Sequence, residues 1–256
     1  SKLGKPITGD YWAERPTAIQ IHGKWHLYFD KYRKHSYGLL TSLDLQHWTD
    51  ESEKLQMPEG IRHGTVMGIS RKTFDRLQKT TEKLPMLYRD DSRKGHPYAK
   101  DPSVVSFNDA YYMYYSIPPG NDPGQEGWNI GIAKSDDLDR WEKVGEIHPE
   151  AEYESKGLCA PEAQVIDGKI HLFYQAYGNG PKDAICHAVS ADGLVFERNA
   201  TNPIFAPTGD WNVGRAIDAD VFVKGDSIYL FWATRDKAYK QQLLGVSVAP
   251  LSGQFK

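Results

Sequence analysis

One short pattern occurs four times in this sequence, and the repeat constrains the fold more than any other feature. Each copy is an apolar stretch, a turn built around Gly, Asp or Asn, and an aromatic stretch. Such stretches, joined by two turn residues, predict antiparallel β-hairpins. The four copies are PTAIQIHGKWHLYFD (16–30), PSVVSFNDAYYMYYS (102–116), PEAQVIDGKIHLFYQ (161–175) and DADVFVKGDSIYLFW (218–232).

A second signature follows the hairpins and lengthens the repeat. SLDLQHW (42–48) is matched by SDDLDRW (135–141), SADGLVF (190–196) is a looser copy, and GVSVAPLSGQF (245–255) resembles a fourth. Each unit therefore reads as a meander of antiparallel strands, with the period of roughly 40 to 50 residues that is typical of a propeller blade.

Residues 61–90 match the repeat less well. HGTVMGIS (63–70) is strand-like, and Ser70 is placed to cap a short helix in the stretch RKTFDRLQK. We count this stretch as a fifth, degenerate unit. The sequence thus predicts an all-β fold, a five-bladed β-propeller formed by residues 1–256 as a single domain.

Composition narrows the possible partners. The formal net charge of −3 comes from interspersed acids and bases, which argues against nucleic acid and membrane surfaces. The mean hydropathy of −0.61 and the lack of a long apolar run argue against a spanning helix, and SKLGKPITGD does not resemble a signal peptide. The only two cysteines, Cys159 and Cys186, lie among small or apolar residues and are expected to be buried thiols. The 15 Tyr, 7 Trp and 9 Phe suit a carbohydrate ligand as well as ordinary β-strand packing.

An acidic residue precedes the turn of every clear unit by six to nine positions: Glu14, Asp101, Glu162 and Asp218. A single Asp before Pro is ordinary turn chemistry, but four acids at matched positions carry more weight. Since the first strand of each blade lines the channel of a propeller, we expect the four carboxylates to share one pocket. Clustered carboxylates supply an acid and a base at one pH, as glycoside hydrolysis requires.

A metal site is the competing use of several acids. The sequence has no DxDxDG loop, and His22 and His26 straddle a turn, so we interpret both histidines as hairpin residues rather than ligands.

The motifs resemble those of glycoside hydrolase family 43, the five-bladed propellers of arabinofuranosidases and xylosidases. AKDPSVVSFNDAYYMYYS (99–116) looks like the family's opening DP motif, whose aspartate is the general base, here Asp101. CAPEAQVIDGKIHLFYQ (159–175) resembles the next blade. AIDADVF (216–222) resembles the blade whose aspartate tunes the pKa of the acid, here Asp218.

The remaining motifs stand at the other end of the chain. AERPTAIQIHGKWHLYFD (13–30) resembles the E-G-P blade with the general acid, here Glu14, although Arg15 replaces the glycine. RHGTVMGISRKTFDRL (62–77) resembles the last blade with its axial histidine, here His63. The resemblance implies a circular permutation, with the fourth and fifth blades in residues 1–82 and the first three in 83–256. The alternative is that 1–82 ends one propeller and 83–256 begins another.

The resemblance implies inverting hydrolysis that releases arabinofuranose or xylose from a plant-type polysaccharide or oligosaccharide. Asp101 would activate a water, Glu14 would protonate the leaving oxygen, and Asp218 would tune and orient Glu14, with the base and acid roughly 6.5 to 9.5 Å apart. Glu162 would contact the substrate or orient Arg215. In another alignment of the motifs, Glu162 would itself be the general acid.

Further substrate-binding candidates are Arg215, Trp211 and Tyr177, which lie in or after turn-rich stretches. We expect no required cofactor, and at most an ion or a water on the axis near His63. Three alternatives stay open. They are a propeller hydrolase for another sugar such as anhydro-galactose, a phosphorylase with a basic phosphate pocket, and a sugar-binding propeller without catalysis.

Overall fold

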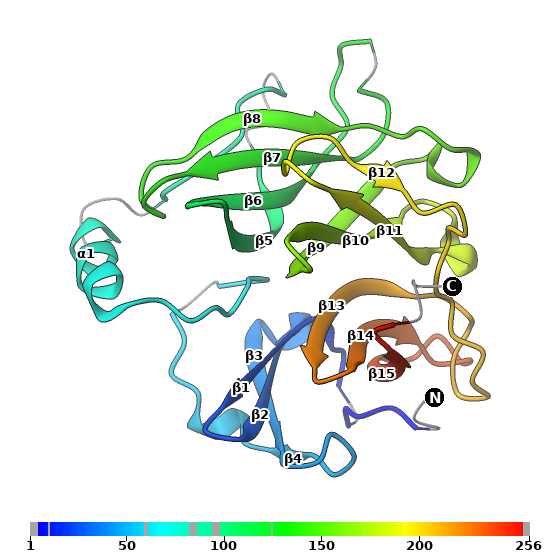
Figure 1. The fold of residues 1–256 in the computed structure, drawn as a ribbon. Coiled ribbons are helices and arrows are strands. Elements are labelled where there is room, and N and C mark those ends of the chain that lie inside the picture. The colour runs from blue at the N-terminus through cyan, green and yellow to red at the C-terminus, as the bar shows by residue number, and fades with distance from the viewer. Residues whose placement is uncertain are drawn as a thin grey trace.

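The computed structural model describes residues 5–9, 11–58, 61–81, 86–93, 98–123 and 125–252. Their strands form four antiparallel sheets (Figure 1). The first sheet contains β1 (Glu14–Ile21), β2 (Lys24–Lys31), β3 (Ser36–Ser42) and β4 (Thr49–Asp50). The second contains β5 (Lys100–Phe107), β6 (Ala110–Ile117), β7 (Asn129–Ser135) and β8 (Glu142–Ile147). The third contains β9 (Leu158–Ile166), β10 (Lys169–Ala176), β11 (Ala184–Ser190) and β12 (Glu197–Arg198), and the fourth contains β13 (Ile217–Lys224), β14 (Ser227–Arg235) and β15 (Gln242–Pro250).

The helical elements are short. The single α-helix of the described residues is α1 (Arg71–Thr81), and the 3₁₀ turns are η1 (Tyr32–Lys34), η2 (Ser52–Lys54), η3 (Glu152–Glu154) and η4 (Gly180–Lys182). None of the described helices is long and apolar enough to cross a membrane.

The four predicted hairpins are confirmed. They are β1–β2, β5–β6, β9–β10 and β13–β14, and each is closed by a two-residue turn. His22 and Gly23, at φ 49° and 80°, have the left-handed conformation that matches the twist of paired strands. The interpretation of His22 and His26 as hairpin residues is confirmed, because His22 lies in the turn and His26 lies in β2.

The second signature closes the loop after the third strand of three sheets. The Ser42 hydroxyl accepts the backbone N–H of Leu45 at 2.8 Å, and the Asp44 carboxylate accepts the N–H groups of Gln46 and His47 at 2.8 Å each. Ser135 with Asp137 and Ser190 with Asp192 make the same bonds, so the looser third copy is confirmed. The stretch compared as a fourth copy extends beyond residue 252, outside the described residues.

The sheets are arranged around a common centre, with β1, β5, β9 and β13 innermost. Contacts run from β5 to β9, from β9 to β13 and from β13 to β1. Residues 61–66 fill the remaining position, between β1 and β5 (Figure 1). There the Thr65 hydroxyl donates to the Pro102 carbonyl at 2.6 Å, and the Val66 N–H donates to the Thr17 hydroxyl at 3.4 Å.

The prediction of five blades is wrong, because the described residues form four sheets. Residues 61–70 occupy the fifth position but form no strand. No two-residue turn and aromatic stretch follow them. Instead the Ser70 hydroxyl accepts the N–H of Thr73 at 3.1 Å and caps α1, as predicted for this serine.

The N-terminal segment completes the fourth sheet. Its strand order is β13-β14-β15, which leaves β15 outermost. The N–H of Ile7 donates to the Leu244 carbonyl at 2.9 Å, and the N–H of Ala13 donates to the Gln242 carbonyl at 2.8 Å. Residues 7–9 and 11–13 therefore lie where the other sheets have their fourth strand. The proposed permutation of blade order stays a prediction.

Each sheet packs a large ring over a small cross-strand neighbour. Phe29 lies opposite Gly38, Tyr115 opposite Gly131, and Trp232 opposite Gly245. A Cβ on Gly38 would lie 2.2 Å from the ring of Phe29, so the contact requires glycine. In the third sheet Cys186 takes the small position opposite Tyr174.

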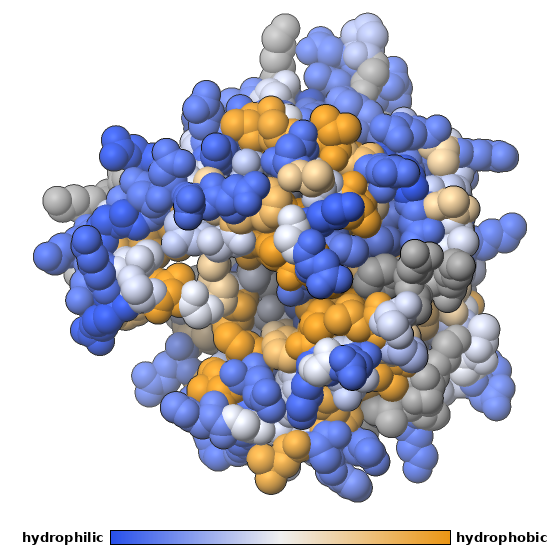
Figure 2. Space-filling view, viewed as in Figure 1, coloured by the Kyte–Doolittle hydropathy of each residue, from blue (hydrophilic) through white to orange (hydrophobic). Residues whose placement is uncertain are grey.

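Cys159 and Cys186 are both buried free thiols, as predicted. On the face shown in Figure 2, hydrophilic residues dominate the rim and hydrophobic residues gather toward the middle.

Candidate active site

Each inner strand enters the centre through the same backbone distortion. The pairing register shifts at a bulge, where a non-glycine residue has φ between 49° and 54°. The residue stands seven positions before the first turn residue in all four strands. His63, with φ 45°, takes the same conformation in the segment without a strand. Such backbone costs of order 1 to 3 kcal/mol and persists where the surroundings hold it, often at functional sites. The five equivalent residues are Arg15, Asp101, Ala160, Asp218 and His63.

This equivalence corrects the predicted alignment of acids. Asp101 and Asp218 occupy the matched position, but Glu14 lies one residue before it and Glu162 two residues after it. The three carboxylates of Glu14, Asp101 and Asp218 nevertheless meet at the bulges, while Glu162 lies further along its strand.

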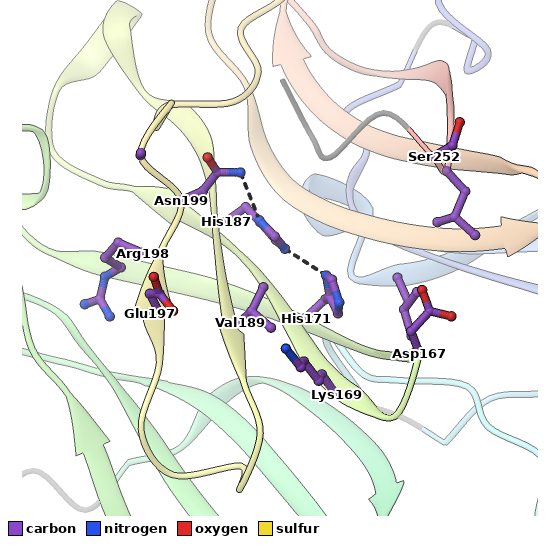
Figure 3. Close-up of a pocket in the computed structure, with 12 residues that line it drawn as sticks. Asp167, Lys169, His171, His187, Val189, Glu197, Arg198, Asn199 and Ser252 are labelled. Carbon is purple, nitrogen blue, oxygen red and sulfur yellow. Dashed lines mark hydrogen bonds between the residues drawn. The ribbon is translucent and has the colours of Figure 1, made fainter.

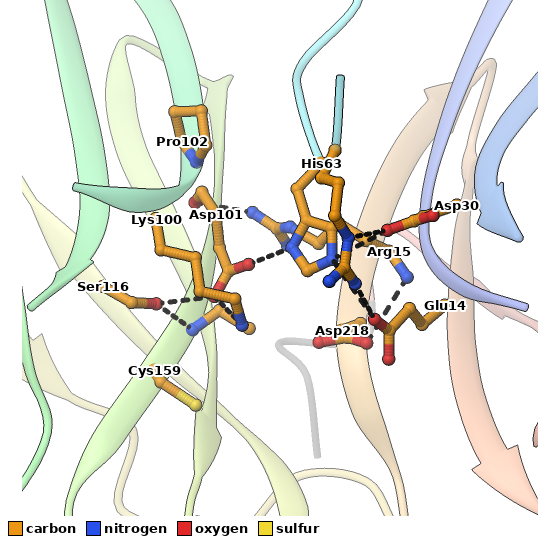
Figure 4. Close-up of polar contacts among 12 residues, drawn as sticks. Glu14, Arg15, Asp30, His63, Lys100, Asp101, Pro102, Ser116, Cys159 and Asp218 are labelled. Carbon is orange, nitrogen blue, oxygen red and sulfur yellow. Dashed lines mark hydrogen bonds and ion pairs between the residues drawn. The ribbon is translucent and has the colours of Figure 1, made fainter. Parts of the chain in front are cut away.

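His63 lies at the centre of the cluster (Figure 4). Its Nδ1 hydrogen-bonds Oδ1 of Asp101, and its Nε2 lies 3.3 Å from both Glu14 Oε1 and Asp30 Oδ2. Burial alone would lower the pKa of the imidazole, but the hydrogen bonds to Asp101, Asp30 and Glu14 raise it to about 10. At neutral pH His63 is therefore an imidazolium that donates on both sides of its ring.

Asp101 is held as a carboxylate. Its side chain is 1% exposed, and Oδ2 accepts from the Ser116 hydroxyl at 2.9 Å and lies 3.2 Å from Nζ of Lys100. Burial alone would raise its pKa, but the hydrogen bond from His63 and the charges of Arg15 and Lys100 bring it well below the usual 3.8. Asp101 is ionised throughout the neutral range.

Glu14 faces the opposite side of the imidazolium. Its Oε1 lies 2.8 Å from a terminal nitrogen of Arg62, and its Oε2 accepts from the Gln242 side chain at 2.8 Å. The Nε of Arg62 also binds Asp30, at 2.7 Å. Asp101 and Glu14 thus contact opposite nitrogens of one ring.

Arg15 ties the inner strands together at the axis. Its guanidinium donates to the carbonyls of Asp101 at 2.7 Å, Pro161 at 2.9 Å and Ala219 at 3.5 Å. Its backbone N–H donates to Oδ2 of Asp218 at 3.3 Å. Burial, and then the negative charges of Glu14 and Asp101, raise the pKa of Asp218.

A second pair of acids lies two residues beyond the bulges. Glu162 accepts from the Ser103 hydroxyl at 3.0 Å, and Asp220 accepts from the N–H of Ala18 at 2.9 Å. Burial raises the pKa of Glu162 to about 7, and burial with the charge of Glu162 raises that of Asp220. This pair belongs to the channel interior rather than to the cluster around His63.

One of the predictions was that Glu162 orients Arg215. The structure shows no contact between these two residues. The Nε of Arg215 pairs instead with Asp183 at 3.0 Å, because the loop that carries Arg215 lies against the end of the third sheet. Trp211 stacks on the buried Trp232 with ring centroids 5.5 Å apart, so its ring packs on the fourth sheet.

Tyr177 belongs to an aromatic group on the Asp101 side of the cluster. Its ring meets Trp128 at a centroid distance of 6.1 Å, Trp128 meets Tyr98 at 6.1 Å, and Nζ of Lys100 lies 6.0 Å from the Trp128 ring. Tyr98 and Tyr177 are exposed, at 39% and 37% of their surface. Exposed flat rings beside carboxylates are suited to a sugar.

The sequence-based search missed several residues of the cluster. Arg62 and Lys100 directly precede His63 and Asp101, and Asp30 and Ser116 are the last residues of two predicted hairpins, opposite Glu14 and Lys100 in the strand register. These positions were a readable signal. Gln242 lies outside the repeat and had none.

Glu14, Asp30 and His63 offer oxygen and nitrogen atoms within 4.8 Å of one another, a chemically suitable set for a metal ion. However, the Arg62 guanidinium contacts both carboxylates and already supplies a positive charge there. This geometry favours the guanidinium over an ion, and the expected ion or water near His63 stays a prediction.

A separate pocket of about 640 Å³ lies at the other end of the third sheet (Figure 3). It is lined by the β9–β10 turn, from Asp167 to Lys169, and by His171 and His187, whose ring nitrogens lie 3.0 Å apart. Since β9 runs from the bulge at Ala160 to this turn, the pocket is about 20 Å from the cluster, at 3.3 Å per residue.

Residues 96–254, more than half of the chain, match the sequence profile of the glycosyl hydrolases family 43. The chain belongs to this family. It is accordingly a glycoside hydrolase propeller that acts on carbohydrate, and its DP motif lies in the matched range.

Solved structures of similar fold cover nearly the whole length of this family 43 protein. A BT0996 RGII complex is similar at a TM-score of 0.68 and 15% identity, over 97% of this protein and 90% of that one. An endo-1,4-β-xylanase from Bacteroides thetaiotaomicron is similar at 0.68 and 17%, over 94% and 92%. A thermostable family-43 glycoside hydrolase is similar at 0.53 and 15%, over 96% and 92%.

Proposed function

We propose that this family 43 chain is an inverting exo-acting glycosidase that releases a terminal pentose, arabinofuranose or xylose, from a plant-type glycan. In this proposal Asp101 is the general base, Glu14 is the general acid, and Asp218 orients the acid. The observation that carries the proposal is the placement of Asp101 and Glu14 on opposite nitrogens of the His63 ring.

That placement supports an inverting mechanism. Two hydrogen bonds of about 3 Å each and the width of an imidazole separate the two carboxylates. Added together, these three lengths give a carboxylate separation larger than the separation of about 5 to 5.5 Å that a retaining mechanism needs. The separation falls in the range of about 6.5 to 9.5 Å that admits a water between base and sugar.

The surrounding groups suit the proposed division of labour. Asp101 is ionised, as a base must be, and its carboxylate is oriented by Ser116 and Lys100. The exposed Tyr98 and Tyr177 stand on the base side, where the terminal sugar would lie. His63, as an imidazolium, would keep both carboxylates in position.

The decisive experiment is a panel of nitrophenyl glycosides that includes α-L-arabinofuranoside and β-D-xyloside, with the first-formed anomer followed by NMR. We expect release from a pentoside with inversion at the anomeric carbon. Activity only on a hexoside would replace pentosides by hexosides as the substrate class. Cleavage that requires phosphate would indicate a phosphorylase. Binding without release of nitrophenol would indicate a sugar-binding propeller.

Variants assign the roles. Asp101→Asn should lose at least about a hundredfold in turnover on every substrate, as expected for removal of a general base. Glu14→Gln should lose as much on substrates with poor leaving groups and much less on dinitrophenyl glycosides, which need no proton. Glu162→Gln tests the other acid, and the exposed Glu53→Gln is a matched control. A leaving-group effect in Glu162→Gln rather than Glu14→Gln would overturn the assignment.

A further inference from the structure

Two arginines and two aromatic rings form a cluster next to Glu14 that the proposed mechanism does not use. Its members, here called the arginine–aromatic cluster, are Trp12, Tyr32, Arg33 and Arg235. The guanidinium carbon of Arg33 lies 3.5 Å from the centroid of the Trp12 ring, and that of Arg235 lies 5.5 Å from it. The rings of Trp12 and Tyr32 meet edge to face at 5.7 Å.

The arginine–aromatic cluster is connected directly to the acid side of the site. Arg62, which binds Glu14 at 2.8 Å, lies 5.7 Å from the Tyr32 ring. Arg235 pairs in the sheet with Gln242, whose side chain donates to Glu14. Trp12 precedes Glu14 by two residues. The ring and cation contacts of Tyr98, Trp128 and Tyr177 among the described residues involve no member of the cluster.

The two arginines carry charge that no carboxylate of the described residues balances. Arg62 and Lys100 are each paired with an acid of the site. Arg33 is exposed, and neither it nor Arg235 pairs with an acid among residues the structure describes. The Nε of Arg235 is buried and has no hydrogen-bond partner among the residues that the structure describes, although a buried donor ordinarily has one.

A guanidinium held against an aromatic ring keeps its fork of N–H donors fixed. That fork matches the oxygens of a carboxylate or sulfate, and the bonds formed are charge-assisted. A general acid protonates the leaving oxygen, so groups beside Glu14 face the leaving part of the substrate. The arginine–aromatic cluster is therefore placed to contact the leaving group rather than the released sugar.

We propose that the arginine–aromatic cluster is a subsite for an anionic group on the leaving part of the glycan, a uronate carboxylate or a sulfate ester. The inference rests on the proposed function for its orientation, because Glu14 defines the leaving side. It makes the substrate an acidic glycan, which the neutral pentosides of the proposed function do not specify.

Binding measurements test the subsite without turnover. In the Asp101→Asn background, calorimetry compares xylotriose that carries a glucuronic acid with the same oligosaccharide after reduction of its carboxyl group. A second pair is a sulfated galactan tetrasaccharide and its desulfated form. We expect the anionic member of at least one pair to bind about tenfold or more tightly, the size of one charge-assisted hydrogen bond, with a preference that declines at high salt.

Arg33→Gln should remove most of that preference without changing the unfolding midpoint, and Arg33→Lys, which keeps the charge and loses the fork, should restore part of it. Lys34→Gln removes a neighbouring exposed charge and should preserve the preference. Equal affinity within both pairs, or a preference that survives Arg33→Gln and Arg235→Gln, would overturn the inference, as would phosphate-dependent cleavage that requires these arginines.

The failures are distinguishable. Arg33-dependent selectivity in a protein that hydrolyses no glycoside would keep the subsite and refute the proposed function. Pentoside hydrolysis without charge selectivity would support the proposed function and refute the subsite.

Discussion

Replacing His63 with glutamine should remove most of the alkaline sensitivity of the fold. The imidazolium bridges Asp101 on one side and Glu14 with Asp30 on the other, and its side chain is 5% exposed. Glutamine fills similar space and retains hydrogen-bonding groups, but it carries no charge. The comparison therefore isolates the contribution of the proton.

The magnitude follows from the pKa. Folding raises the pKa of His63 from 6.5 to about 10. A group whose pKa is raised stabilises the fold fully below its unfolded pKa and loses that contribution as the pH rises through the folded value. At about 1.36 kcal/mol per pKa unit, His63 contributes about 4 kcal/mol near pH 7 and close to nothing above about pH 10.5.

Urea unfolding of the wild type and His63→Gln, followed by tryptophan fluorescence at about pH 7 and about pH 10.5, measures this difference. Tyrosines and lysines titrate in both proteins, so their effects largely cancel in the comparison. The wild type should lose about 4 kcal/mol more than the variant over that interval. A matched control is His187→Gln, because burial, and then the neighbouring His171, lower the pKa of His187 to about 3. That variant should keep the wild-type alkaline slope.

Equal pH dependence in the wild type and His63→Gln would refute the reasoning, since it would mean that the imidazole is neutral in the fold. The same slope in His63→Gln with lower stability at every pH would point to packing as the role of this side chain.

Three further predictions concern the packing of the fold and its stability at acid pH. Gly38→Ala should lower the free energy of unfolding by about 1 to 3 kcal/mol through the clash with Phe29, and an unchanged denaturation midpoint would contradict that packing. Ser70→Ala should cost about 1 kcal/mol, seen as faster amide exchange at the start of α1, and unchanged exchange would refute the cap. Because the pKa of Asp101 is lowered, its contribution is present above pH 3.8 and is lost as the pH falls through the lower folded value, so Asp101→Asn should flatten the acid limb of the stability profile. An acid limb identical to that of the wild type would argue against an ionised, paired Asp101.

The hairpins and their second signature were predictable because the information is local. A two-residue turn such as His22–Gly23 fixes the pairing, and the Ser42–Asp44 bonds lie within six residues of sequence. The helix after residue 70 was likewise readable from its capping serine. The strand content of 61–70 was not, since a strand needs a partner, and no hairpin partner follows in the sequence.

The site was predictable in part. Asp101, Asp218, Glu14 and His63 were found from the repeat and the family resemblance. The bulge that sets the equivalent positions depends on backbone conformation, so the offset of Glu14 and Glu162 could not be read from spacing alone. Gln242, which lies outside the repeat, contributes through a contact between distant segments, since it meets Glu14 across 228 positions.

The pairing of residues 7–9 and 11–13 with β15 has a consequence for how the chain acquires its structure. Thr8 and Leu244, which share a hydrogen bond, are 236 positions apart, and contacts between such distant residues slow folding. At roughly 5 to 20 residues per second, the ribosome needs on the order of 10 to 50 seconds to reach β15 after it has made the segment that covers it. During that interval the segment waits unpaired, and β15 then emerges with an open edge that can pair with another chain. The fourth sheet is therefore the last of the four that synthesis allows to be completed, although its outermost segment is made first.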